Sequence, residues 1–195
     1  MLSKLKSLIA GFLGLFGVDI FIRKPGYHYV RDYYGKSSFK QTDIRTLPLF
    51  GELAGTVIVN KRSSLYYDRL YTIYQIISSL CDSVGQNKEI KMAEVGVYKG
   101  GTSYFIASLM ERLKLQYTHY CFDTFEGHKP EDINKSVETD HTSGLFSDTS
   151  FEGVQQYLQN FQNVHVYKGR FQERCDILQD AQLHFVHLDM DIYDP

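Results

Sequence analysis

The segment IKMAEVGVYKGGTS, residues 90–103, joins a short apolar run to a glycine-rich turn and then to the start of an amphipathic stretch. Residues 90–95 form a short, mostly apolar segment that a glycine follows, which predicts a β-strand. Beyond the turn, residues 102–113 place their large apolar side chains on one side, which predicts a helix. The segment therefore predicts a strand, a glycine turn and a helix, the first unit of an α/β fold.

The same alternation continues on both sides of this segment. Further strands are predicted at three places: 117–122, 164–167 and 183–188. Helices are predicted over 64–80, behind a capping box at 149–152, and over 171–179. Strands that alternate with helices favour a doubly wound parallel sheet with right-handed crossovers, a Rossmann-like α/β fold.

Composition limits the class of protein. The 195 residues are 43% hydrophobic and 23% charged, which is typical of one globular domain with a sizeable core. The net charge of -2 gives no reason to expect a nucleic-acid partner. The three cysteines are widely spaced and include no Cys-x-x-Cys pair, so neither a disulfide framework nor a zinc knuckle is predicted. A reducing cytoplasmic location is the expectation.

The N-terminal part has a different character. Residues 1–18 combine a basic start with a glycine-broken apolar run that is too short to span a bilayer. Two interpretations stay open: a helix packed on the domain or on a second subunit, and an anchor on the inner membrane surface. Residues 25–61 are aromatic-rich and without a clean period, and either cover a substrate cleft or form a surface layer. We therefore expect an N-terminal extension over 1–62 and the α/β domain over 63–195.

The glycine turn is the first candidate binding element. In open α/β sheets ligands bind at the carboxyl ends of the strands, and a glycine turn lets them approach the backbone and a helix N-terminus. A dinucleotide fingerprint needs glycine at position 98, where Tyr98 would crowd a pyrophosphate. S-adenosylmethionine has no pyrophosphate, and Glu94 could face its amino group. The alternative is a tight turn that binds nothing.

A second feature strengthens the cofactor interpretation. The second predicted strand ends in Asp123, where a carboxylate can accept both hydroxyls of an adenosine ribose. Alternatively, Asp123 only caps the following turn. Taken together, the two features favour an adenosine-type cofactor, S-adenosylmethionine. The candidate cofactor-binding residues are Glu94, Gly96, Tyr98, Gly100, Thr102, Ser103 and Asp123.

The fourth predicted strand ends in a pair of carboxylates, Asp189 and Asp191. Residues two apart in an extended chain point the same way, so both carboxylates could face the site. Hard cations such as Mg²⁺ prefer oxygen ligands, which makes the pair a candidate metal site. An Asp-x-Asp pair also serves glycosyltransferases in holding a metal on a nucleotide sugar, so the pair alone leaves both chemistries open.

Four histidines accompany these features. We assign His184 and His187, which flank the fourth strand, mainly to packing or outer hydrogen bonds. The polar stretch at 126–148 is long for a plain connection and contains His128 and His141. These two histidines either contact a substrate or lie at the surface.

Four motifs occur in this order along the chain: EVGVYxGGTS, FDTFEG, KGRF and HLDxDxY. Together they resemble the macrocin O-methyltransferase family, sugar O-methyltransferases of macrolide and aminocoumarin tailoring pathways. The resemblance extends roughly from residue 63 to residue 195. The glycine turn is also similar to that of catechol O-methyltransferase, a more distant relative in the same metal-assisted class.

The resemblance implies roles for individual residues. Gly96, Gly100 and Ser103 would line the methionine end of S-adenosylmethionine, and Asp123 would hold the ribose. By the same resemblance, Asp189 is the first magnesium ligand. Asp191 is the general base for the acceptor hydroxyl. The implied substrate is a sugar, a glycosylated metabolite or a similar small diol.

This sequence departs from the family pattern at its C-terminal end, and the departure leaves alternative functions open. The family has a further Asp-Asp pair after the next strand, and this sequence ends at residue 195 without one. We therefore expect a domain truncated after its fourth strand, with that strand as an apolar sheet edge. A non-catalytic remnant of such an enzyme is the first alternative, and a metal-dependent glycosyltransferase is the second. The acceptor, the metal and a homo-oligomeric state stay open.

Overall fold

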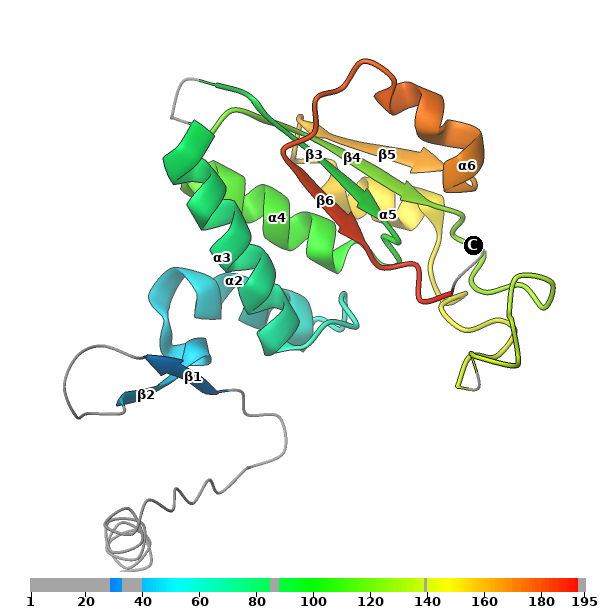
Figure 1. Cartoon of the computed structure of the whole chain (residues 1–195), viewed down its shortest axis with the longest axis horizontal. Helices are drawn as coiled ribbons and strands as arrows, with labels where there is room; N and C mark the ends of the chain where they lie inside the picture. Colours follow the sequence, from blue (N-terminus) through cyan, green and yellow to red (C-terminus); the bar gives the residue numbers. More distant parts are fainter. Residues whose placement is uncertain (1–28, 33–39, 85–87, 139, 193–195) are drawn as a thin grey trace, which may run out of the picture.

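A computed structural model of the chain describes residues 29–32, 40–84, 88–138 and 140–192 (Figure 1). Its centre is a parallel sheet with the strand order β5-β4-β3-β6. The strands are β3 (Ile90–Val95), β4 (Tyr117–Asp123), β5 (Val164–Lys168) and β6 (Phe185–Leu188). Each strand lies within two residues of its predicted position, and the doubly wound α/β fold is confirmed.

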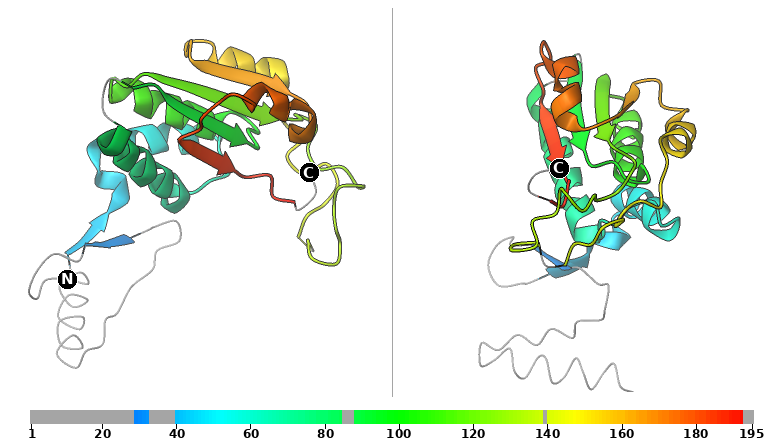
Figure 2. Two further views of the ribbon diagram at one scale, coloured as in Figure 1. Left: turned by 45° about the horizontal axis from the view of Figure 1, so that its top comes forward. Right: turned by 90° about the vertical axis from the view of Figure 1, so that its right-hand side faces the viewer.

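Helices cover both faces of this sheet (Figure 2). On one face lie α4 (Gly101–Arg112) and α5 (Phe151–Leu158), joined by stacked Tyr104 and Tyr157 rings 5.0 Å apart. On the other face, α6 (Phe171–Arg174) continues into the 3-10 turn η2 (Cys175–Leu178). The long helix α3 (Tyr67–Val84) packs against α4. These helices were predicted, with shifts at their ends.

The segment before α3 differs from the prediction. Residues expected to be irregular form a short antiparallel pair, β1 (Tyr29–Asp32) and β2 (Lys40–Asp43), the 3-10 turn η1 (Ile44–Thr46) and the helix α2 (Pro48–Val59). Pro48 occupies the first turn of α2, where its missing N–H costs nothing. Phe50 is fully buried against α3 and α4, with its ring 6.0 Å from that of Phe105. Because α2 is apolar on nearly all sides, it lacks the polar stripe that makes a helix visible in a sequence.

The cap of α5 also differs from the prediction. Ser150 is the N-cap, and its hydroxyl accepts a hydrogen bond from the backbone N–H of Gly153 at 3.1 Å. Thr149, the predicted cap, instead donates its hydroxyl to the carbonyl of Tyr98 at 2.6 Å. The capping box at 149–152 is therefore wrong by one residue, and Thr149 ties the start of α5 to the glycine turn.

Ser150→Ala is expected to lower the free energy of unfolding by about 1 kcal/mol, because the Gly153 N–H loses its partner. Urea denaturation measures this difference. Ser143→Ala, at an exposed loop position, is the matched control and should change the free energy by less than about 0.5 kcal/mol. Equal effects of the two substitutions would contradict the cap assignment.

Strand β6 forms one edge of the sheet. Among the described residues β6 pairs only with β3, and Val186 and Leu188 stay 46% and 60% exposed. This is the apolar edge that the sequence predicted. The apolar run within residues 1–18 lies outside the described residues, and none of the described helices combines the length and hydrophobicity needed to cross a bilayer.

Candidate cofactor and substrate site

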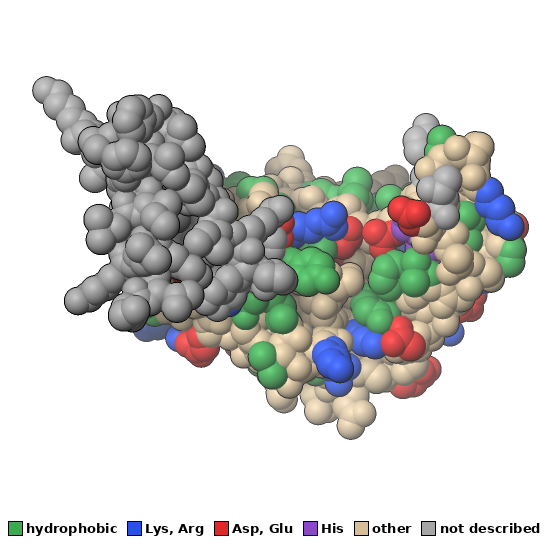
Figure 3. Space-filling view, turned by 90° about the horizontal axis from the view of Figure 1, so that it is seen from below, with side chains coloured by type: hydrophobic (Ala, Val, Ile, Leu, Met, Phe, Trp, Pro, Cys, Tyr) green, Lys and Arg blue, Asp and Glu red, His purple; other side chains and the backbone are tan. Residues whose placement is uncertain are grey.

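A cavity of about 910 Å³, counted with its open mouth, lies at the carboxyl ends of the central strands. The turn after β3, the end of β4 and the segment after β6 all contribute to its wall. Figure 3 looks at the molecule from below and shows acidic side chains beside a histidine and hydrophobic groups. Six of the nine predicted site residues line the cavity: Gly96, Tyr98, Thr102, Asp123, Asp189 and Asp191.

Gly96 permits a close contact at the floor of the cavity. Its φ angle is +94°, and a Cβ atom there would lie 2.1 Å from the carbonyl oxygen of Asp189. The backbone on both sides is fixed, because the Gly96 N–H donates to Phe122 and the Asp189 N–H donates to Val95. Only glycine fits, so this residue brings the end of β6 against the glycine turn.

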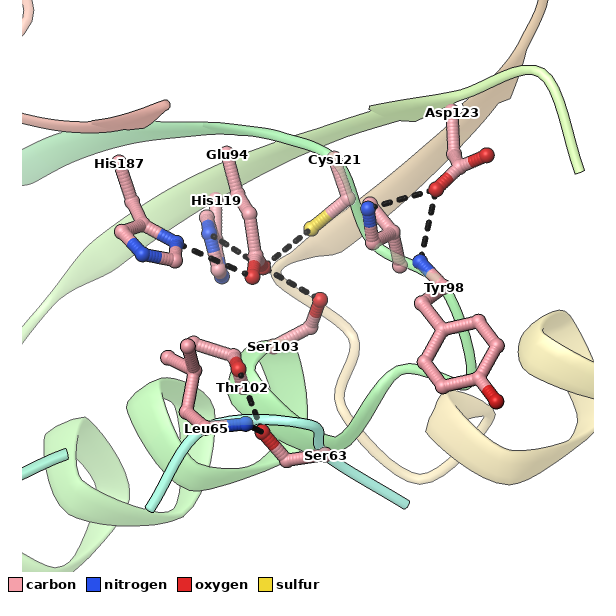
Figure 4. Close-up of polar contacts among 11 residues, drawn as sticks. Ser63, Leu65, Glu94, Tyr98, Thr102, Ser103, His119, Cys121, Asp123 and His187 are labelled. Carbon is pink, nitrogen blue, oxygen red and sulfur yellow. Dashed lines mark hydrogen bonds and ion pairs between the residues drawn. The ribbon is translucent and has the colours of Figure 1, made fainter. Parts of the chain in front are cut away.

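Asp123 organises the glycine turn itself. One carboxylate oxygen accepts the N–H groups of Val97 and Tyr98 at 2.8 and 2.7 Å (Figure 4). The other accepts the N–H of Phe125 at 2.6 Å. An ionised carboxylate offers about four acceptor positions, so these three bonds leave room for one more. Through Phe125, Asp123 caps the turn that follows it, as one of the two interpretations predicted, and through Val97 and Tyr98 it also holds the glycine turn. Its remaining acceptor position can take a hydroxyl of a ligand in the cavity.

Three predicted residues lie outside the cavity wall. Glu94 and Ser103 are fully buried behind it, and the Ser103 hydroxyl donates to Glu94 Oε2 at 2.5 Å (Figure 4). Gly100, the N-cap of α4 with φ of +78°, packs under α5, where an added Cβ would come within 3.1 Å of Val154. The structure thus separates Glu94, Gly100 and Ser103 from the six residues that share the cavity.

Asp189 and Asp191 reach the cavity by a different backbone path from the one predicted. Strand β6 ends at Leu188, and Asp191 has a left-handed φ of +62°. Both side chains nevertheless line the cavity. Burial raises the pKa of the Asp189 carboxyl; the neighbouring His187 opposes this shift, and the charge of Asp191 adds to it. A partly desolvated carboxylate beside a second one would be stabilised by a bound cation.

The polar loop after β4 folds back over the cavity. His128 is only 8% exposed and lines the wall, with its ring 5.1 Å from that of His141 and 5.3 Å from that of Phe146. Burial lowers the pKa of His128, and His141 lowers it further. Arg170 anchors the loop by donating to both carboxylate oxygens of Asp132, at 2.7 and 2.8 Å. Of the two loop histidines, His128 is therefore the one placed to meet a substrate.

Sequence reasoning missed part of the wall. Arg62 and Ser63 enter it because the N–H of Gly101 donates to the Arg62 carbonyl, and a Cβ on Gly101 would lie 2.5 Å from that carbonyl. The Arg62 guanidinium lies 4.3 Å from the centre of the Tyr157 ring. No sequence pattern around Arg62 predicts that it lines the cavity. Arg170 belongs to the KGRF motif, which is the signal that could have identified it.

His184, which precedes β6, and His187, which lies within it, both stay out of the cavity wall. His184 accepts the backbone N–H of Lys91 at 3.1 Å, and His187 Nδ1 lies 3.5 Å from Glu94 Oε1. Both contacts agree with the predicted role in packing and outer interactions.

Comparisons with known proteins complete the description. Among the solved structures that are similar to this chain is the O-methyltransferase NovP, with a TM-score of 0.48 and 22% identity over 66% of this chain and 55% of that one. Another is CalS11, a calicheamicin methyltransferase, with a TM-score of 0.45 and 17% identity over 82% of this chain and 76% of that one. The chain thus spans about half the length of NovP. No curated protein sequence matches it.

A family profile described as a methyltransferase domain matches residues 93–194, just over half of the 195 residues. The chain therefore belongs to this methyltransferase domain family, a family of S-adenosylmethionine-dependent enzymes.

Proposed function

We propose that this domain is a metal-assisted O-methyltransferase that transfers a methyl group from S-adenosylmethionine to a hydroxyl of a sugar or a similar diol-bearing small molecule. One observation carries the proposal. The turn organised by Asp123 and the carboxylates of Asp189 and Asp191 line the same cavity, so a cofactor and an acceptor would meet there.

The wall fits the parts of S-adenosylmethionine. Asp123 keeps one acceptor position, enough for one ribose hydroxyl rather than both while the turn is closed. The aromatic side chains of Phe146 and Phe171 offer apolar surface to an adenine ring. When bound, the cofactor supplies a methyl group on a positively charged sulfur.

The carboxylates fit a hard divalent cation. Asp189 would hold it, and magnesium needs only one or two protein carboxylates when substrate oxygens complete its shell. When bound, such an ion supplies positive charge that lowers the pKa of an acceptor hydroxyl. Asp191 would remove the proton of that hydroxyl as general base. Alignment of the hydroxyl with the methyl group is the remaining contribution of the wall.

The acceptor class rests on two supports. The motif resemblance to the macrocin O-methyltransferases indicates a sugar, and two vicinal hydroxyls would chelate a cation held at Asp189. The polar part of the wall, with His128 and the Asp132–Arg170 ion pair, suits a ligand rich in hydroxyl groups. We propose a small-molecule partner on these grounds.

Asp123→Asn tests the cofactor half of the proposal. The amide oxygen can still accept the N–H groups of Val97 and Tyr98, but the NH2 group can accept neither the Phe125 N–H nor a ribose hydroxyl. The affinity for S-adenosylhomocysteine should therefore fall by about 10- to 100-fold. Isothermal titration calorimetry with S-adenosylhomocysteine measures the affinity. Alanine is a poorer choice, because it would leave three backbone N–H groups without their acceptor.

Asp180→Asn makes the same chemical change at an exposed position outside the cavity and should leave the affinity unchanged. Circular dichroism of each variant confirms that the protein stays folded. If the folded wild-type chain bound no S-adenosylhomocysteine, or if both variants bound equally well, this cavity would not be the cofactor site.

A further inference from the structure

A buried polar cluster lies directly behind the cavity wall, on the face of the sheet covered by α4 (Figure 4). It consists of Glu94 on β3, His119 and Cys121 on β4, and His187 on β6. Glu94 is the register partner of both Cys121 and His187, and His119 precedes Cys121 by two residues. Parallel register and a spacing of two place all four side chains on one face.

The cluster has unmet polar capacity. Glu94, His119 and Cys121 are completely buried. Neither ring nitrogen of His119 makes a hydrogen bond, and neither does Glu94 Oε1. Each buried polar group without a partner costs about 1–3 kcal/mol, and native proteins rarely leave several in one place. Something that binds oxygen, nitrogen and sulfur together would remove this cost.

We propose that Glu94, His119 and Cys121 bind a transition-metal ion of the zinc class, with His187 as the fourth ligand. The ligand atoms of the first three all lie within 4.8 Å of one another. Glu94 Oε2 is 3.6 Å from His119 Nε2 and 4.0 Å from Cys121 Sγ, and Glu94 Oε1 is 3.5 Å from His187 Nδ1. Zinc bond lengths of about 2.0–2.3 Å imply edges of about 3.3–3.8 Å for a tetrahedral site, so small side-chain rotations would bring the first three ligand atoms to these distances. His187 lies beside the other oxygen of Glu94 and would have to turn toward the ion to complete the site.

The charge of the ligand side chains and their chemical softness favour a zinc-class ion. A thiolate from Cys121 and the carboxylate of Glu94 would balance a divalent cation, so the buried site would carry no net charge. Burial lowers the pKa of His119 to about 4, and its neutral ring therefore has a lone pair for a metal. Sulfur and imidazole ligands select zinc over magnesium, which separates this site from Asp189 and Asp191.

The surroundings fit a structural rather than a catalytic role. The Ser103 hydroxyl donates to Glu94 Oε2 and would fix the carboxylate as an outer partner. The ligands come from three adjacent strands, β3, β4 and β6, so a bound ion would clamp them together behind the glycine turn. A metal ion that binds the folded chain and not the unfolded chain would raise the free energy of unfolding with the logarithm of the metal concentration.

Cobalt(II) is the probe for this site, because a cobalt–thiolate bond gives an intense near-ultraviolet charge-transfer band. The background protein carries Cys81→Ser and Cys175→Ser, so that Cys121 is the only cysteine. After removal of metals with a chelator, we expect one equivalent of cobalt(II) to produce this band. Zinc should then displace the cobalt ion, and the band should disappear. Adding Cys121→Ser should abolish the band and weaken zinc binding by at least about 100-fold.

Two further variants sharpen the test. Asp180→Asn, at an exposed position outside the cavity, should leave zinc affinity unchanged, whereas Ser103→Ala should weaken it by about tenfold through the outer hydrogen bond. A folded Cys121-only protein that binds cobalt(II) without the thiolate band would overturn the proposal, and this result needs no variant within the cluster. Equal zinc affinity with and without Cys121 would overturn it as well.

Discussion

Gly96→Ala is expected to lower the free energy of unfolding by about 3–5 kcal/mol and to abolish S-adenosylhomocysteine binding. Two effects add. A side chain at φ of +94° costs about 1–2 kcal/mol of backbone strain. The new Cβ would also lie 2.1 Å from the Asp189 carbonyl oxygen, and that backbone cannot retreat without stretching its hydrogen bond to Val95.

Urea denaturation separates these two effects when Gly144→Ala serves as the control. Gly144 has a similar φ of +82°, but the nearest atom to an added Cβ is the Ser147 hydroxyl at 3.9 Å. This control isolates the strain and should cost only about 1 kcal/mol. If the two substitutions lowered the free energy of unfolding equally, the segment after β6 would not pack against Gly96 as closely as described.

The same contact explains why the cofactor side and the acceptor side of the cavity are not independent. Gly96 belongs to the turn that Asp123 organises, and Asp189 opens the segment that carries Asp191. A shift at Gly96 therefore moves the carboxylates as well as the turn. We expect Gly96→Ala to weaken metal and cofactor binding together.

The sheet was predictable because each strand and most of its helices carry their own signal. The strands are short apolar runs bounded by polar or glycine residues, and α4 has a one-sided apolar stripe. Helix α2 was missed because apolar residues occupy nearly all sides of the helix around Phe50, so its sequence shows no alternation of apolar and polar faces. The cap of α5 was misplaced because Thr149 and Ser150 are both good caps, and only the contact of Thr149 with Tyr98 decides between them.

The candidate site was predictable from strand ends, but side-chain direction was not. The rule that ligands bind at carboxyl ends identified Gly96, Asp123 and Asp189. Glu94, two residues before Gly96, lies on the face of the sheet that α4 covers, where Ser103 donates to its carboxylate, and so it stays behind the cavity wall. Arg62 reaches the wall only through contacts between segments distant in sequence, which no local pattern encodes.

Asp191→Asn is expected to reduce turnover by about 10²- to 10⁴-fold, because an amide cannot accept the proton of the acceptor hydroxyl. Asparagine suits this position, since it tolerates the left-handed φ of +62° and retains the shape of aspartate. The fold and the affinity for S-adenosylhomocysteine should therefore stay unchanged. Release of S-adenosylhomocysteine, measured with Mg²⁺ over a panel of sugars and vicinal diols, gives the turnover.

Asp189→Asn provides the contrast that separates a base from a metal ligand. Its loss of turnover should be accompanied by a higher Mg²⁺ requirement, whereas Asp191→Asn should keep the wild-type requirement and lose only the rate. Asp180→Asn should match the wild type in both measurements. If Asp191→Asn kept its turnover, the proton would have to leave by another route. His128 would be the next group to test, because it lines the same wall and burial lowers the pKa of its ring.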